Sequence, residues 1–172
     1  APYPLALAYA ALTRSQQGKP AEALMQQAIA LAPDDALVRY LQGLHLRATG
    51  DSLASLEALG LAVTLDPENP AYQAELASAY RLLGRLHEAE YWFEAAVRVS
   101  NGDARFQSLL AQFYADEAHN LTDAGVDALA DAARVSDEAD IQAGYGWALY
   151  LAGRQAEALT LLETLLHAEP DN

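Results

Sequence analysis

The chain has no cysteine, and it contains lysine and methionine only once each, as Lys19 and Met25. Without cysteine it can form no disulfide framework, no thiolate metal site and no thiol nucleophile. A cysteine-free chain is compatible with the cytoplasm and with the bacterial periplasm, so this absence does not decide the compartment. The abundance of alanine, leucine and arginine beside a single lysine suggests a bacterial coding sequence rich in G and C.

Long apolar runs and positive charge are also scarce. No stretch approaches the roughly 18 apolar residues of a membrane-spanning helix, so no membrane insertion is expected. Ten basic residues face 24 acidic ones, which gives a net charge of −14. An acidic chain repels phosphate groups, and we therefore expect neither nucleic acid nor an anionic membrane surface as a partner.

The residue patterns of common catalytic and cofactor sites are missing as well. There is no glycine-rich phosphate loop and no serine elbow. The four histidines, His45, His87, His119 and His167, are too far apart in the sequence to resemble a metal-ligand cluster. We expect no catalytic residue, no cofactor and no metal, and so no enzyme activity in this segment.

What the chain does contain is one pattern of roughly 34 residues, repeated five times. Each copy ends in a helix stop near Pro33, Pro67, Asn101, Ser136 or Pro170. A turn glycine recurs at Gly18, Gly50, Gly84 and Gly153. Self-similarity at this period predicts stacked supersecondary units that share a continuous core.

The third copy shows what each unit is. Residues 71–83 carry apolar side chains at helical spacing, and Gly84 is the residue type that ends a helix in the left-handed conformation. Residues 86–99 carry a second helical pattern, which Asn101 and Gly102 end. The unit is therefore two helices joined by a tight turn, here called helix A and helix B. Small residues at fixed positions predict close approach of the two helices.

These residues resemble the tetratricopeptide repeat (TPR) family. The third copy matches in its L-A-x-x-Y segment at 76–80, in Gly84, in Glu88-Ala89 and in Phe93. The fifth copy matches at Tyr145-Gly146 and further along the unit. The resemblance implies an all-α, right-handed superhelical solenoid of about five repeats and ten antiparallel helices. We expect one array over residues 1–172, with units at approximately 2–35, 36–69, 70–103, 104–138 and 139–172.

Two copies depart from the pattern. In the first, Gly18 lies two residues too close to Pro33, which predicts a short helix B. In the fourth, residues 116–123 hold about two extra residues and no glycine, which predicts a longer and more mobile connection.

The resemblance implies that helix A of each unit lines a concave groove that binds extended or helical peptides. The candidate residues of this groove are Tyr40, Leu44, Arg47, Ser78, Arg81, Arg105, Gln112, Trp147 and Tyr150. Arg14, Arg47 and Arg81 recur once per repeat and could bind a partner with acidic groups. Alternatively, these arginines only complement the negative end of helix A. The aromatic candidates are either interface anchors or ordinary packing residues.

The family's carboxylate clamp for chaperone C-termini needs lysine, asparagine and arginine at set positions of helix A. The corresponding early positions carry Tyr40 and Leu44 in one unit and Ala74 and Ser78 in the next, so we expect that clamp to be absent. The leading functional hypothesis is a non-catalytic protein–protein interaction scaffold. The alternative is an assembly module that self-associates or continues into a larger repeat protein through its terminal helices. The last predicted helix supports the alternative, because it carries an apolar strip wider than one neighbouring helix covers. The strip consists of Ala158, Leu159, Leu161, Leu162, Leu165 and Leu166. We expect the chain to be a piece of a longer protein.

Overall fold

The computed structural model describes residues 3–117, 123–135 and 139–168, and in these ranges it contains ten α-helices and no strand. The helices form five A–B pairs. They are α1 (Pro4–Gln16) and α2 (Glu22–Leu31), α3 (Ala36–Thr49) and α4 (Ser52–Leu65), α5 (Pro70–Leu82) and α6 (Leu86–Val99), α7 (Ala104–Glu117) and α8 (Asp123–Val135), and α9 (Ala139–Leu151) and α10 (Gln155–Ala168). The predicted all-α repeat fold is confirmed.

The chain divides into two compact units, an N-terminal unit of Ala1–Ala96 and a C-terminal unit of Val97–Asn172. The division falls near the end of α6. The two units are described separately below.

The turn glycines end helix A as the sequence predicts. Gly50 has a φ of 90° and Gly153 a φ of 81°, values that L-residues with a side chain rarely adopt. After Gly50, the amide of Asp51 donates to the carbonyl of Leu46 at 2.9 Å, and after Gly153 the amide of Arg154 donates to the carbonyl of Leu149 at 2.9 Å. These bonds satisfy carbonyls that the helix end would otherwise leave without partners.

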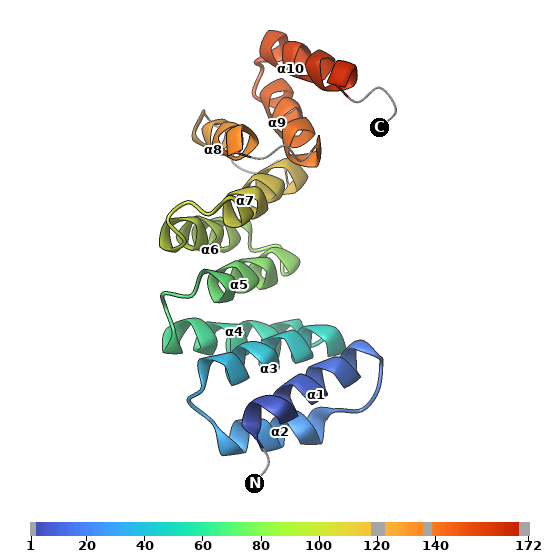
Figure 1. Ribbon diagram of the computed structural model, residues 1–172, viewed down its shortest axis with the longest axis vertical. Helices are drawn as coiled ribbons and strands as arrows, with labels where there is room; N and C mark the ends of the chain where they lie inside the picture. The colour runs from blue at the N-terminus through green and yellow to red at the C-terminus, as the bar shows by residue number, and fades with distance from the viewer. Residues whose placement is uncertain (1–2, 118–122, 136–138, 169–172) are drawn as a thin grey trace. The chain divides into compact units, whose positions relative to one another are not determined.

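Small residues in helix A allow helix B of the same pair to approach closely, as predicted. A Cβ atom added to Gly43 would lie 2.5 Å from Cγ of Leu59, and one added to Gly146 would lie 2.8 Å from Cδ2 of Leu162. In both pairs a leucine of helix B fills the space that the glycine leaves. Figure 1 shows α3 and α4 side by side, the pair in which the first of these contacts lies.

The N-terminal unit has two apolar clusters between successive helices. The first joins α1, α2 and α3 through the buried residues Ala8, Ala11, Leu12, Ala21, Met25, Ala28, Val38 and Leu41. The second joins α4 and α5 through Leu59, Ala62, Val63, Tyr72, Leu76 and Ala79. Tyr40 packs against both clusters, so the core continues from one repeat to the next.

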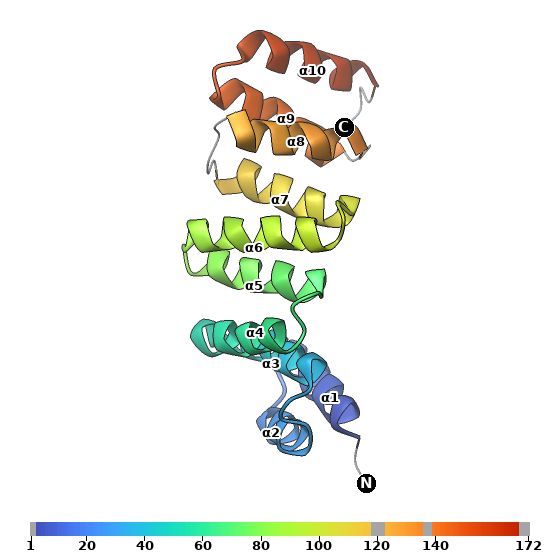
Figure 2. The same cartoon turned by 90° about the vertical axis from the view of Figure 1, so that its left-hand side faces the viewer.

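The C-terminal unit has a smaller cluster, formed by Val126 of α8, Leu149 of α9 and Ala158 of α10. Tyr145 and Leu161 pack against it. Figure 2 shows α9 beside both α8 and α10, the arrangement that brings these side chains together.

A buried polar contact ties the first three helices of the N-terminal unit together. Nδ1 of His45 lies 2.7 Å from the hydroxyl of Ser15, and Nε2 of His45 lies 3.1 Å from a carboxylate oxygen of Glu22. Since a carboxylate only accepts, Nε2 carries the proton that is donated to Glu22. The Ser15 hydroxyl also contacts the carbonyl of Ala11 at 2.7 Å. His45, which the sequence marks as an isolated histidine, is thus a structural link between α1, α2 and α3.

The predictions for the two irregular copies have different outcomes. Helix α2 spans 10 residues, whereas the other helices span 13 or 14, so the short first helix B is confirmed. The turn predicted at residues 116–123 falls mostly on 118–122, which lie outside the described residues.

Candidate functional site

Two predicted groove residues of α3 contact α5 in the N-terminal unit. The guanidinium of Arg47 forms an ion pair with the carboxylate of Glu75, and both side chains are half-buried. The ring of Tyr40 lies 4.8 Å from that of Tyr72, centroid to centroid, at an angle of 31°. Burial raises the pKa of both Tyr40 and Tyr72, so each phenol stays neutral and apolar contact dominates this joint between helices A.

The remaining arginines of the predicted series also have partners. Arg14 donates to the carbonyl of Pro20 at 3.0 Å, and Arg105 pairs with Asp103 at 2.9 Å. Arg81 is half-buried in the last turn of α5 and has interactions of its own. An acidic ligand would therefore share these guanidinium groups with existing partners, which an arginine with five donors permits.

The polar and apolar candidates between these arginines are in different surroundings. Leu44 is half-buried and packs against the first apolar cluster. The hydroxyl of Ser78 donates to the carbonyl of Ala74 at 3.0 Å, within its own helix. Gln112 is exposed on α7.

The most accessible aromatic candidates are two residues of α9. Trp147 and Tyr150 are 50% and 49% exposed, and their rings stack with centroids 5.4 Å apart at an angle of 17°. Stacked aromatic rings that are half exposed combine a large apolar area with little conformational freedom to lose on binding.

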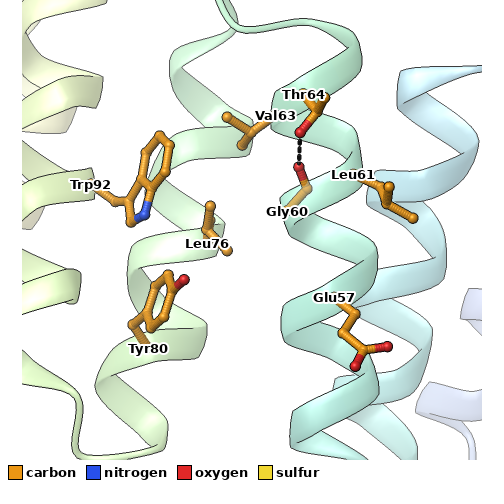
Figure 3. A pocket seen from close by; sticks show the side chains of 8 residues that line it. All are labelled: Glu57, Gly60, Leu61, Val63, Thr64, Leu76, Tyr80 and Trp92. Carbon is orange, nitrogen blue, oxygen red and sulfur yellow. Dashed lines mark hydrogen bonds between the residues drawn. The ribbon is translucent and has the colours of Figure 1, made fainter.

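A pocket in the N-terminal unit lies on the helix B side, between α4 and α6, with α5 forming its floor (Figure 3). Its volume is about 560 Å³. Leu76, Tyr80 and Trp92 face α4 across it, and on α4 the hydroxyl of Thr64 donates to the carbonyl of Gly60 at 2.8 Å. The pocket has aromatic and aliphatic walls and one carboxylate at its edge, that of Glu57.

A second pocket, in the C-terminal unit, shares three repeat positions with the first. It has a volume of about 520 Å³ and is lined by Tyr145 and Leu149 of α9 and by Leu161 of α10. Counted from the turn glycines, these three residues correspond to Leu76, Tyr80 and Trp92.

The sequence predictions concerned helix A only, so they did not include these pockets beside helix B. One signal was available in the sequence. Gly60 lies inside α4, and a Cβ added there would meet no atom within 4 Å. A glycine that packing does not require in a helix interior indicates an open surface beside it.

Within residues 3–117, 123–135 and 139–168, no three histidine, aspartate or glutamate side chains gather where they could hold a metal ion. In the same ranges no helix is long and apolar enough to cross a membrane. The chemistry of the described sites is that of apolar contact, hydrogen bonding and ion pairing.

Paired antiparallel helices, glycine-ended turns and small residues at fixed positions define a helical-repeat protein. A family model described as tetratricopeptide repeat matches residues 5–70 and 40–104, which together cover more than half of the chain. The chain belongs to the tetratricopeptide repeat family. No curated protein sequence matches it.

Several solved structures share the fold. Kinesin-light-chain-like TPR repeats from Podospora anserina align with a TM-score of 0.78 at 20% identity, over 100% of both chains. MamA from Desulfovibrio magneticus RS-1 aligns with a TM-score of 0.77 at 20% identity, over 96% of this chain and 97% of that one. YrrB, described as a TPR protein with an unusual peptide-binding site, aligns with a TM-score of 0.74 at 19% identity, over 88% of this chain and 78% of its own.

Proposed function

We propose that this protein is a non-catalytic protein–protein interaction scaffold that binds a peptide or a partner helix on the helix A faces of its repeats. The observation that carries the proposal is the stacked pair of Trp147 and Tyr150, each half exposed on α9. Large aromatic groups held rigid at a surface are the usual anchors of protein interfaces. Membership of the repeat family and the peptide-binding site named for YrrB support the same function.

We further propose that Arg47 and Arg81 favour partners with acidic groups. Arg47 already pairs with Glu75, so a ligand carboxylate would add to this ion pair by using the remaining guanidinium donors. Both arginines are only half-buried, and salt should therefore weaken this contribution. Trp147 and Tyr150 supply apolar contact, which salt affects little.

The test is selection of binding peptides from a random library, followed by affinity measurements on two variants. Trp147→Ala should weaken binding about tenfold or more, because it removes an anchor ring. Tyr91→Ala is the matched control, since Tyr91 is an equally exposed aromatic residue on helix B. Replacing Arg47 and Arg81 together should weaken binding mainly at low salt. Selected peptides that bind both aromatic variants equally would contradict the proposal.

A second candidate function, that of an assembly module, is favoured by one observation at the end of the C-terminal unit. Leu159 and Leu166 of α10 are 59% and 64% exposed. Leucines this exposed on one helix indicate a contact surface for a further helix, from a second copy or from a continuing repeat array.

A further inference from the structure

Helix α4 lacks the polar outer side that a surface helix normally has, although other helices precede and follow it in the array. Among its 14 residues only Glu57 is charged. Leucines are exposed on it, and Leu53 is 68% and Leu61 47% exposed. The exposed residues of α4, here called its outer face, are Leu53, Glu57, Leu61, Thr64 and Leu65. At about 100° per residue they span about 120°, the width of a stripe by which a helix packs against a neighbour.

The repeat pattern does not require leucine on this outer face. Leu53 and Leu61 lie 3 and 11 residues after the turn glycine Gly50. The equivalent positions after Gly84 and Gly153 carry smaller or polar residues, namely His87 and Ala95 in α6 and Ala156 and Thr164 in α10. The packing of a repeat is therefore achieved without a large apolar side chain at these positions, and the leucines of α4 need another explanation.

The glycine inside α4 is a second departure from the pattern. Gly60 lies 10 residues after Gly50, and the equivalent positions carry Glu94 in α6 and Glu163 in α10. Glycine weakens a helix, and no close contact within the chain demands it here, because an added Cβ would meet no atom within 4 Å. Gly60 does line the pocket between α4 and α6. The missing side chain leaves the pocket open, as a glycine does where another molecule approaches the backbone.

The pocket and the outer face form one continuous surface. Glu57, Leu61 and Thr64 belong to both. Across the pocket, Tyr80 and Trp92 face α4 (Figure 3), and both rings also pack against the second apolar cluster, which holds them in place. The cavity of about 560 Å³ is within the size range of ligand-binding clefts. A side chain that enters it from solvent would meet preformed aromatic and aliphatic walls.

The charges around this surface favour a basic partner. Glu57 is the one charged residue of the outer face, and it forms no ion pair within the described residues. The guanidinium of Arg85 lies 4.7 Å from the centre of the Tyr80 ring, but it also pairs with Glu88 at 2.5 Å, so its charge is balanced. Residues 51–96 carry eight acidic and two basic residues in all. A partner with basic groups beside its apolar contacts complements this potential.

The walls of the pocket indicate the conformation of the partner. They belong to α4, α5 and α6, whose backbone groups are bonded within the helices, so an extended peptide would leave its own amides unpaired against them. A helix satisfies its own backbone and can place side chains in an apolar groove. From Leu53 to Leu65 the outer face is about 18 Å long at about 1.5 Å per residue, which corresponds to three or four turns of a partner helix.

We propose that the outer face of α4 and the adjoining pocket bind an amphipathic helix of a partner protein. Its apolar side packs on the exposed leucines and places one large side chain in the pocket, beside Gly60. A lysine or arginine of the partner pairs with Glu57. This surface lies on helix B, apart from the helix A faces, so the inference goes beyond the interaction function proposed above and adds a second surface with the opposite charge preference.

The probe is a displayed library of 18-residue amphipathic helices, selected on the intact 172-residue chain. Leucine, phenylalanine, tryptophan and methionine vary along one side of these peptides, and lysine, glutamine and glutamate vary beside them. Selected peptides should carry net positive charge, and their affinity should fall as salt is added. Selection of acidic peptides would contradict the proposed charge preference, and a library that yields no binder would overturn the inference.

Two variants test where the selected peptides bind. Gly60→Gln places a side chain of the length found at the equivalent positions into the pocket, without adding charge, and should weaken binding by about tenfold or more. Its melting temperature should not fall, because glutamine forms helices better than glycine, so loss of binding is distinguished from loss of folding. Glu57→Arg should also weaken binding by about tenfold or more and reduce its salt dependence, because two like charges would then meet.

Glu163→Gln is the matched control for both variants. It places glutamine at the repeat position of Gly60 and removes an exposed carboxylate, but it lies in the C-terminal unit, so binding should be unchanged. Peptides that bind Gly60→Gln and Glu57→Arg as well as they bind the parent chain would overturn the inference. If Trp147→Ala weakens the binding of those same peptides, they occupy a helix A face, and the proposed interaction function stands without this second surface.

Discussion

The N-terminal and C-terminal units fill equivalent buried positions with different chemistry. His45 and Ser55 in the N-terminal unit correspond to Ala148 and Ala158 in the C-terminal unit, and all four are at most 2% exposed. His45 bonds Ser15 and Glu22, and the hydroxyl of Ser55 donates to the carbonyl of Gly43 at 2.8 Å. The repeat pattern therefore demands burial at these positions, and it leaves the choice between hydrogen bonds and a methyl group open.

The two units also differ in the burial of the helix B leucine that packs against the glycine of helix A. Leu59 is fully buried under α5, whereas its counterpart Leu162 is only half-buried. A residue with neighbours on every side cannot move to accommodate a change, and a residue near an open surface can. Each prediction below compares equivalent or neighbouring positions on this basis.

The largest effect is expected for Ala96→Trp, at a fully buried position of α6. An indole in place of a methyl group overpacks the core and should cost about 3 kcal/mol or more of the free energy of unfolding. Arg98→Trp, two residues further along the same helix and exposed, is the control and should cost little. Urea denaturation followed by circular dichroism measures both. A normal unfolding midpoint for Ala96→Trp would show that the repeat register is wrong.

Gly43→Ala and Gly146→Ala should differ, although the positions are equivalent. The new Cβ would lie 2.5 Å from the immobile Leu59 in the first case and 2.8 Å from the half-buried Leu162 in the second. Alanine also gains about 1 kcal/mol of helix propensity over glycine. We expect a net loss of about 1–2 kcal/mol for Gly43→Ala and a change near zero for Gly146→Ala. Equal effects in thermal unfolding would contradict the difference in packing.

His45→Ala should destabilise the N-terminal unit by about 1–3 kcal/mol, because Ser15 and Glu22 lose their shared partner and a cavity opens. Ser55→Ala is the control. The carbonyl of Gly43 keeps its bond within the helix, and alanine is the residue found at the equivalent position, Ala158. We expect Ser55→Ala to lower the free energy of unfolding by about 1 kcal/mol or less. Hydrogen exchange of α1 and α2 would show whether the loss is confined to the first three helices.

The smallest predicted effect is a change in stability at acidic pH. Hydrogen bonds from Gln26 and His45 lower the pKa of Glu22 below its ordinary value. A lowered pKa in the folded state stabilises the protein above the unfolded pKa, and this stabilisation is lost as the pH falls through the folded pKa. Glu22→Gln should therefore be slightly less stable than the parent chain at neutral pH, and the two should converge as the pH falls through the lowered pKa of Glu22. Because Glu22 is largely exposed, the difference should be small. Unfolding midpoints that stay parallel at all pH values would argue against this contact.

Much of the fold could be predicted from the sequence because each of the five repeats carries residues that mark the ends of its helices. The short α2, the left-handed conformation at Gly50 and Gly153, and the close approach of helix B at Gly43 all follow from residue type and spacing. Spacing did not show that Leu59 is the residue that packs on Gly43. The candidate site was harder to predict. Spacing predicted that Tyr40 and Arg47 share one face of helix A, but it could not show that Tyr72 and Glu75 contact them.

The sequence by itself determined the class of structure, the helix pairs and the positions that must be small, since these depend on periodicity within one chain segment. Only the tertiary structure decided which of those positions remain accessible. Val63 and Leu166 occupy the same repeat position, yet one is buried and the other is 64% exposed, because among the described residues a following helix packs on Val63 and none packs on Leu166. Accessibility depends on neighbours that are distant in sequence, and a local pattern contains no information about them.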